Sequence, residues 1–195
     1  MTTNKAVADR ETRMRFMEVS ETTGEALRDF WKVLEPHLPA ILDGFYAHLG
    51  SEPELAKLVG TQAPRLKQAQ GSHWARLFAG TFDEGYMQSV NTIGLTHNRI
   101  GLEPRWYIGG YKFVMNRLVD IAVKKYRWNP AKLSQVICAV NTAVCLDMDL
   151  AISTYQNVLM ELQQEQERQI SHAIDTFKVK VDATMTEVSN SAEKV

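Results

Sequence analysis

The chain has 195 residues, of which 45% are hydrophobic and 23% charged, and its formal net charge at pH 7 is −1. This length fits one domain of ordinary size plus an extension. The nearly balanced charge gives no electrostatic basis for binding nucleic acid or an anionic membrane. The N-terminus has no apolar signal core and no run of ~18 apolar residues follows, so we expect a cytoplasmic protein without a membrane span.

Helical patterns run through the whole chain. All six prolines fall where helices would begin or end. Apolar residues between them recur at helical spacing, and no alternating segment of useful length favours a strand. A short N-terminal helix is expected over about residues 11–20, before the first long one. The sequence therefore predicts an all-α fold.

The segment after residue 86 is the most informative part of the chain. It reads as a helix that carries His97 near its C-terminal end, with Gly101 fitting a left-handed cap and Pro104 starting the next helix. An imidazole that points from a helix end into an apolar interior suits the proximal side of a haem iron. We expect Nε2 of His97 to bind iron and Nδ1–H to donate to a carbonyl near Ile93 or Gly94.

Three segments resemble the globin domain of globin-coupled sensors, the bacterial relatives of protoglobin. They are HNRIGLEPRWY at 97–107, ILDGFY at 41–46 and FAGTFDEGY at 78–86. From their order and spacing, the resemblance extends over roughly residues 10–160. The first string is specific, whereas the other two are weak alone. The resemblance implies a globin-like fold with an extra N-terminal helix, a bound haem b, and His97 as the proximal iron ligand.

The same resemblance assigns the ligand side of the haem. It places the distal tyrosine at Tyr46, whose hydroxyl would stabilise bound O2 by roughly 1–3 kcal/mol. Ala69 falls where relatives often carry threonine, serine or leucine, so Tyr46 or a water would act alone. His73 on the distal helix is a weaker candidate for a second iron ligand. A core role is the alternative for each of these residues.

The remaining predicted site residues surround these ligands. The apolar walls of the haem would be Phe45, Leu66, Leu77, Phe78, Ile93, Trp106, Ile108 and Tyr111, although plain core packing explains each of them equally well. Tyr107 would touch the proximal side and sense the state of His97. The haem propionates would be met by Lys67, Arg99 or Arg105.

The last sixty residues change character. An apolar stripe over 133–162 fits the final globin helix, and residues 163–169 then contain no apolar side chain. A new seam begins at Ile170 with steps of four and three, out of phase by about one residue, which is typical of a coiled coil. We therefore expect a sensor globin domain at 1–162 and a helical linker toward a signalling module at 163–195. The seam comprises Ile170, Ile174, Phe177, Val181, Thr184, Val188, Ser191 and Val195; a frayed, solvated tail is the alternative.

Enzyme motifs are absent from the sequence. No Gly-x-Ser-x-Gly, P-loop, Gly-x-Gly-x-x-Gly or Cys-x-x-Cys is present. Asp147 and Asp149 are two residues apart, hence on different helix faces, and do not form a carboxylate metal site. Cys138 and Cys145, seven apart on one face, are expected to be buried reduced thiols.

These features predict a sensor rather than an enzyme. The expected protein binds O2, with CO and NO as competing ligands, pairs as a homodimer through its last two globin helices, and signals to a chemoreceptor-type module in chemotaxis or aerotaxis. One alternative is a haem-free globin-fold dimerisation or interaction domain of a stress-signalling protein. The other is an enzyme-like globin that detoxifies nitric oxide.

Overall fold

The structure is a computed structural model that describes residues 2–192, with side chains described over 9–185. It divides into two units between Thr154 and Tyr155. The described residues form helices and no strand, which confirms the all-α prediction. The helices are α1 (Thr2–Phe16), α2 (Glu21–Leu34), η1 (Glu35–His37), α3 (Leu38–Leu49), α4 (Pro53–Val59), η2 (Gly60–Gln62), α5 (Ala63–Ala79), α6 (Glu84–Arg99), α7 (Pro104–Tyr126) and α8 (Pro130–Ala192).

The core of the first unit forms where α5 packs against α2 and α3, and where α7 packs against the same two helices. Leu27, Phe30, Leu34 and Leu77 have no exposed surface. The C-terminal end of α5 can approach α2 closely because both contact residues are glycines. Gly80 has a φ of +66°, and a Cβ there would lie 2.6 Å from the Cα of Gly24.

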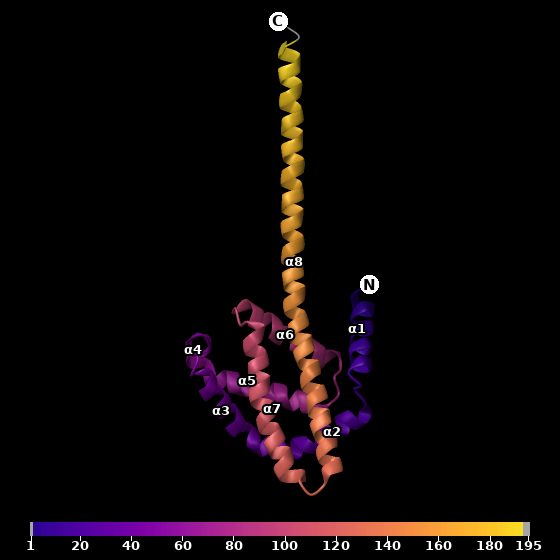
Figure 1. The fold of residues 1–195 in the computed structure, drawn as a ribbon, viewed down its shortest axis with the longest axis vertical. Helices are drawn as coiled ribbons and strands as arrows, with labels where there is room; N and C mark the ends of the chain where they lie inside the picture. Colours follow the sequence, from indigo (N-terminus) through magenta and orange to yellow (C-terminus); the bar gives the residue numbers. More distant parts are fainter. Residues whose placement is uncertain (1, 193–195) are drawn as a thin grey trace. The chain divides into compact units, whose positions relative to one another are not determined.

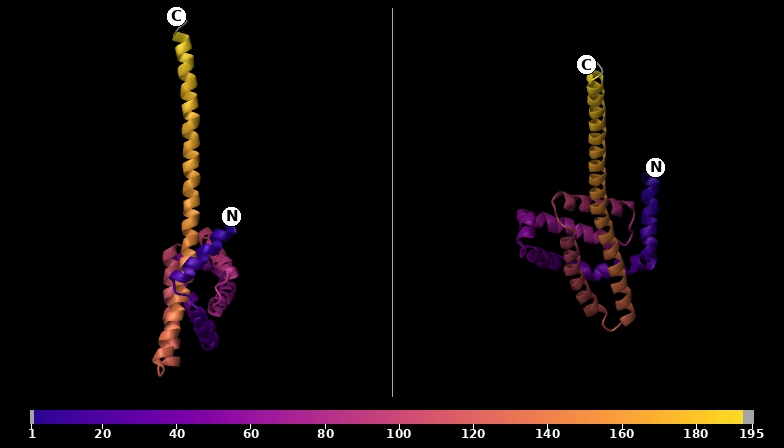
Figure 2. Two further views of the ribbon diagram at one scale, coloured as in Figure 1. Left: turned by 90° about the vertical axis from the view of Figure 1, so that its right-hand side faces the viewer. Right: turned by 45° about the horizontal axis from the view of Figure 1, so that its top comes forward.

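Helices α7 and the first part of α8 lie side by side as an antiparallel pair (Figures 1 and 2). The turn between them spans Arg127 to Asn129, and Pro130 then starts α8. Leu118 on α7 and Val136 on α8 are both buried in the common core. The pair therefore supplies one wall of the first unit.

The N-terminal helix differs from its predicted bounds of 11–20. Helix α1 ends at Phe16, and Ser20 instead caps α2 through a capping box with Thr23. Between them Glu18 adopts a φ of +55°, which turns the chain. The local cap chemistry of Ser20 thus outweighs the helical pattern that continues into it.

Helix α8 continues without a break through the polar residues 163–169 to Ala192. Glutamine, glutamate and arginine are strong helix formers, so a helix persists without apolar residues. Side-chain contacts one turn apart support it: Gln169 Nε2 donates to Glu165 Oε1 at 3.1 Å, and Arg168 forms an ion pair with Glu165 at 2.9 Å.

One expectation for α8 is wrong, and another is not decided by the structure. Cys138 is exposed and Cys145 is half-buried, so neither free thiol is fully buried. Within the described residues, the helix Pro130–Met185 is long and apolar enough to cross a membrane, judged by length and composition alone. Its most apolar window of 18 residues has a mean hydropathy of 1.6, and 44% of that window is buried in the protein. Core helices of soluble proteins pass the same test, so this is weak evidence for a span.

Candidate functional site

His97 lies in the last turn of α6, as predicted, and its backbone is held by a Schellman motif. The N–H of Leu102 donates to the carbonyl of His97 at 2.9 Å, and the N–H of Gly101 donates to the carbonyl of Asn98 at 3.0 Å. Gly101 supplies the required left-handed conformation with a φ of +72°. Pro104 then begins α7, so both predicted helix boundaries are confirmed.

The imidazole of His97 is half-buried and neutral at physiological pH. Burial lowers its pKa to about 4, and the nearby charge of His73 acts in the same direction. Its ring packs edge-on against Tyr107, with ring centroids 5.3 Å apart. Nδ1 is buried without a hydrogen-bond partner, so the structure does not show the predicted bond to a carbonyl near Ile93 or Gly94.

A cluster of hydrogen bonds around Asp147, connected to His97 through Tyr111 and Tyr107, was not predicted. Asp147 has no exposed surface, although it is charged in its ordinary state. Its carboxyl group accepts hydrogen bonds from the hydroxyls of Tyr86 and Tyr111, and Nε2 of His73 lies 2.9 Å away. Burial raises the pKa of both tyrosines well above 10, and the negative charge of Asp147 adds to the shift.

The predicted separation of Asp147 from Asp149 is confirmed, because the two side chains have different partners. Asp149 forms an ion pair with Arg13 of α1, and Arg13 also donates to Ser153 Oγ at 3.1 Å. These contacts attach the N-terminal helix to α8. Only Asp147 faces the interior.

Tyr46 lies on α3 in a cluster of aromatic rings. It is half-buried, and burial raises its pKa to about 12. The ring of Phe45 contacts Tyr46 edge-on at 5.5 Å and Phe113 at 5.7 Å. The Nζ atom of Lys67 lies 5.8 Å from the centre of the Tyr46 ring. The hydroxyl of Tyr46 thus keeps its proton over the whole physiological pH range.

The residues predicted to surround the haem and its ligand differ in how far they are exposed to solvent. Leu77, Phe78, Phe45 and Tyr111 are buried, whereas Ile108 is 48% exposed and Ala69 is exposed. The ring contacts of Phe78 are with Phe30, Trp31 and Trp74 in the core next to α2. The remaining residues of this predicted set are half-buried: Leu66, Ile93, Trp106 and Tyr107.

Two of the three cations predicted to meet the propionates are already ion-paired. Lys67 contacts Asp43 at 2.6 Å, and Arg105 contacts Glu103 at 2.7 Å while lying over the Trp106 ring. Arg99 is exposed at the end of α6. Arg99 is therefore the candidate that requires no ion pair to be broken.

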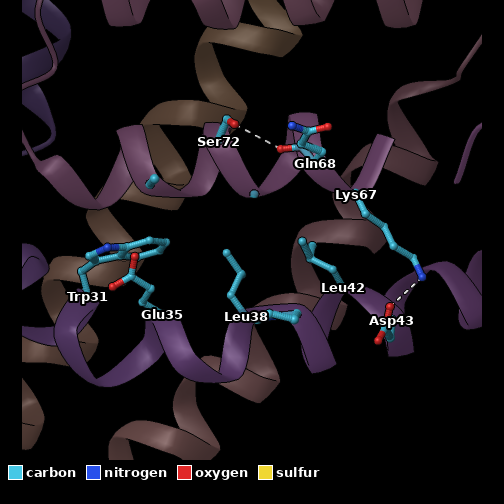
Figure 3. A pocket seen from close by; sticks show the side chains of 11 residues that line it. Trp31, Glu35, Leu38, Leu42, Asp43, Lys67, Gln68 and Ser72 are labelled. Atoms are coloured by element: carbon cyan, nitrogen blue, oxygen red, sulfur yellow. Dashed lines mark hydrogen bonds and ion pairs between the residues drawn. The ribbon is translucent and has the colours of Figure 1, made fainter. Parts of the chain in front are cut away.

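A groove of about 530 Å³ opens between α3 and α5, beside the end of α2 (Figure 3). Leu38 and Leu42 extend from α3 toward α5, and Trp31 lies at the opposite end of the groove from the ion pair of Lys67 with Asp43. His97 does not line it. The groove is therefore separate from the site around His97.

Comparison with known proteins places this arrangement in a family. The family model of Protoglobin matches residues 8–161, which is most of the chain. The chain belongs to the Protoglobin family. This match covers α2 to α7, including the segment with His97, and it confirms the resemblance on which the sequence-based assignment depends.

Individual relatives extend the comparison of this protoglobin domain. It is 28% identical over 111 residues to the haem-based aerotactic transducer HemAT of Halobacterium salinarum, covering 55% of this chain and only 23% of the relative. The globin domain of the Geobacter sulfurreducens globin-coupled sensor superposes with a TM-score of 0.69 at 23% identity, over 74% of this chain and 96% of that one. The ferric globin domain of Escherichia coli DosC gives a TM-score of 0.62 at 16% identity, over 75% and 99%. The fold is thus globin-like, of the type found in globin-coupled sensors.

Proposed function

We propose that this protoglobin domain binds haem b and senses O2, with His97 as the proximal ligand through Nε2. The half-buried, neutral imidazole of His97, with its buried Nδ1, is the observation that carries the proposal. Only the neutral imidazole ligates a metal, and a pKa of about 4 keeps it in that form at pH 7. Its Nδ1, buried and without a partner among the described residues, is available to donate the hydrogen bond that would orient the ring on a metal.

The residues present therefore fit the cofactor. Haem iron, when bound, supplies the site for O2 and for its competitors CO and NO. Lys67, Arg99 and Arg105 are the proposed propionate partners, with Arg99 first among them. The apolar walls proposed from the sequence lose support at Ile108, because its side chain is half exposed.

Tyr46 is the proposed donor to the bound gas. Its raised pKa of about 12 ensures that the hydroxyl carries its proton at every physiological pH. Ala69 offers no second donor, so the stabilisation rests on this hydroxyl or on a water. Tyr46→Phe is expected to speed O2 release by roughly tenfold or more, the factor for one hydrogen bond to a partly charged ligand.

His73 is the second candidate for an iron ligand. It is the histidine whose charge influences the pKa of His97, and its Nδ1 is also buried without a partner. Its Nε2 already faces Asp147 at 2.9 Å. The ferric spectra of the wild type and of His73→Leu distinguish the two cases: a low-spin six-coordinate spectrum lost in the variant assigns His73 as a ligand.

The segment 163–195 is the proposed linker between the globin domain and a signalling module. Apolar side chains of the predicted seam are exposed on the single chain, at 61% for Ile170, 48% for Ile174 and 68% for Phe177. A second copy would cover them, which supports a homodimer. Val188, Ser191 and Val195 lie outside the residues whose side chains are described.

The chain spans about a quarter of the length of the aerotactic transducer that it matches. We infer by analogy that a chemoreceptor-type module receives the signal in a cytoplasmic protein used for aerotaxis. Two of the relatives are named as a transducer and as a sensor, which supports a sensing role for this chain.

Absorption spectra of the purified full chain, after haem supplementation, test the proposal. The wild type is expected to show a strong Soret band that shifts on reduction and again with CO. His97→Ala is expected to lose or displace the band, whereas the matched change His37→Ala, at an exposed histidine outside the site, leaves it unchanged. A wild type without a Soret band refutes haem binding and favours a haem-free dimerisation domain. Sustained nitric oxide turnover with a physiological reductant would favour an enzyme.

A further inference from the structure

Asp147 accepts hydrogen bonds from side chains of three other helices, and it has no role in the function proposed above. The donors are Tyr86 of α6, Tyr111 of α7 and His73 of α5, while Asp147 itself belongs to α8. A fully buried carboxylate persists only where such donors replace water. Its position in the fold is thus fixed by the helices that surround His97.

The direction of the bonds around Tyr111 follows from its single hydroxyl hydrogen. The Tyr111 hydroxyl donates to Asp147, so its oxygen is the acceptor in the 2.9 Å hydrogen bond with Tyr107, and the Tyr107 hydroxyl donates. The ring of Tyr107 in turn packs edge-on against His97 at 5.3 Å. An ordered chain of contacts therefore runs from His97 through Tyr107 and Tyr111 to Asp147.

We propose that Asp147 is a positioning residue for the proximal histidine. Acting through Tyr111 and Tyr107, it fixes the orientation of the His97 imidazole and couples the ligand state of the site to α8. This inference rests on the proposed haem-binding function. Coupling of this kind is reciprocal, so a change imposed on α8 alters the ligand affinity by the same factor by which ligand binding biases α8.

Two tyrosines of the Asp147 cluster form a matched pair for testing this proposal. Tyr86 and Tyr111 are both buried, at 4% and 7% exposure, and both donate to Asp147. Tyr111 shares a hydrogen bond with Tyr107, whereas the interaction of Tyr86 with Tyr107 is electrostatic. Replacing either by phenylalanine removes one donor from the same carboxylate with nearly the same loss of atoms, but Tyr111→Phe alone interrupts the path to His97.

The test uses the full chain loaded with haem, as wild type, Tyr111→Phe, Tyr86→Phe and Asp147→Asn. The Fe–imidazole stretching frequency of the ferrous, ligand-free form reports the orientation and bonding of His97. Hydrogen exchange over residues 155–185, with and without CO, reports the response of α8. We expect Tyr111→Phe and Asp147→Asn to shift the frequency, to change CO release roughly fivefold, and to reduce the exchange response. Tyr86→Phe is expected to leave all three readouts near those of the wild type.

Equal shifts in Tyr111→Phe and Tyr86→Phe would overturn the inference, because Asp147 would then act only through the stability of the cluster. An unshifted frequency in Tyr111→Phe would overturn it as well, even if Asp147→Asn fails to fold. A wild type that binds haem and CO but shows no exchange response refutes the coupling alone. A wild type without a Soret band refutes the proposed function, and this inference with it.

Discussion

The contact between α6 and α8 at Gly94 permits a quantitative prediction. Gly94 lies one turn before His97, and a Cβ built on it would be 2.9 Å from Cβ, 3.1 Å from Oγ1 and 3.2 Å from Cγ2 of Thr154. Gly109 of α7 is also helical, but a Cβ there meets nothing within 4 Å. The two glycines therefore differ mainly in the room around them.

Replacing each glycine by alanine separates helix propensity from steric conflict. Gly109→Ala is expected to raise the free energy of unfolding by roughly 0.5–1 kcal/mol, because alanine restricts the unfolded chain and favours the helix. Gly94→Ala gains the same amount but suffers overpacking of typically 1–3 kcal/mol. The two variants should thus differ by about 1–3 kcal/mol, with Gly94→Ala the less stable.

Urea unfolding of the haem-free full chain, followed by helical circular dichroism, measures this difference. Thr154→Ala removes two of the three atoms near the added methyl group. The double variant with Gly94→Ala should therefore be more stable than the sum of the single changes predicts. If Gly94→Ala stabilises the protein as much as Gly109→Ala does, α6 and α8 are not in contact at this point and the reasoning fails.

Three other measurements follow from the structure. Because the pKa of His97 falls from 6.5 to about 4 on folding, the haem-free protein should keep its full stability above pH 6.5 and lose about 3 kcal/mol as the pH falls to about 4; this acid slope should be absent from unfolding curves of His97→Leu. Arg13→Ala should lower the free energy of unfolding by about 1 kcal/mol and increase hydrogen exchange in α1, since Arg13 joins α1 to Asp149; unchanged exchange would contradict this role. Phe177→Lys should weaken dimers in analytical ultracentrifugation, whereas Asp175→Lys, outside the seam, should not; equal effects would argue against the seam.

Local chemistry explains which parts of the fold were predictable. The end of α6 and the start of α7 depend on Gly101 and Pro104, whose backbone preferences act within one turn. The error at residues 11–20 is of the same kind, because the capping box of Ser20 is also a local signal. The continuity of α8 shows that a polar stretch predicts solvent exposure rather than a helix end.

The site was predictable only in part, since its contacts join residues far apart in the sequence. The Asp147 cluster connects positions separated by 36 to 74 residues, and periodicity indicates a face without naming its neighbours. The sequence signal was the presence of two acidic residues, Asp147 and Asp149, within an otherwise apolar segment. Ile108 illustrates a register problem: successive helical residues are rotated by about 100°, so Ile108 cannot share the direction of Tyr107 and Tyr111, which are one turn apart.

The Schellman motif at the end of α6 limits how the helix can respond to a displacement of His97. A helix that ends without such a motif can absorb a pull on its last turn by unwinding one residue. Here the carbonyl of His97 already accepts a hydrogen bond from the N–H of Leu102, so the last turn cannot unwind without breaking that bond. If the His97 imidazole is displaced, we expect α6 to move as a whole, and the close approach of Gly94 to Thr154, the last residue of the first unit, to transmit that movement to α8.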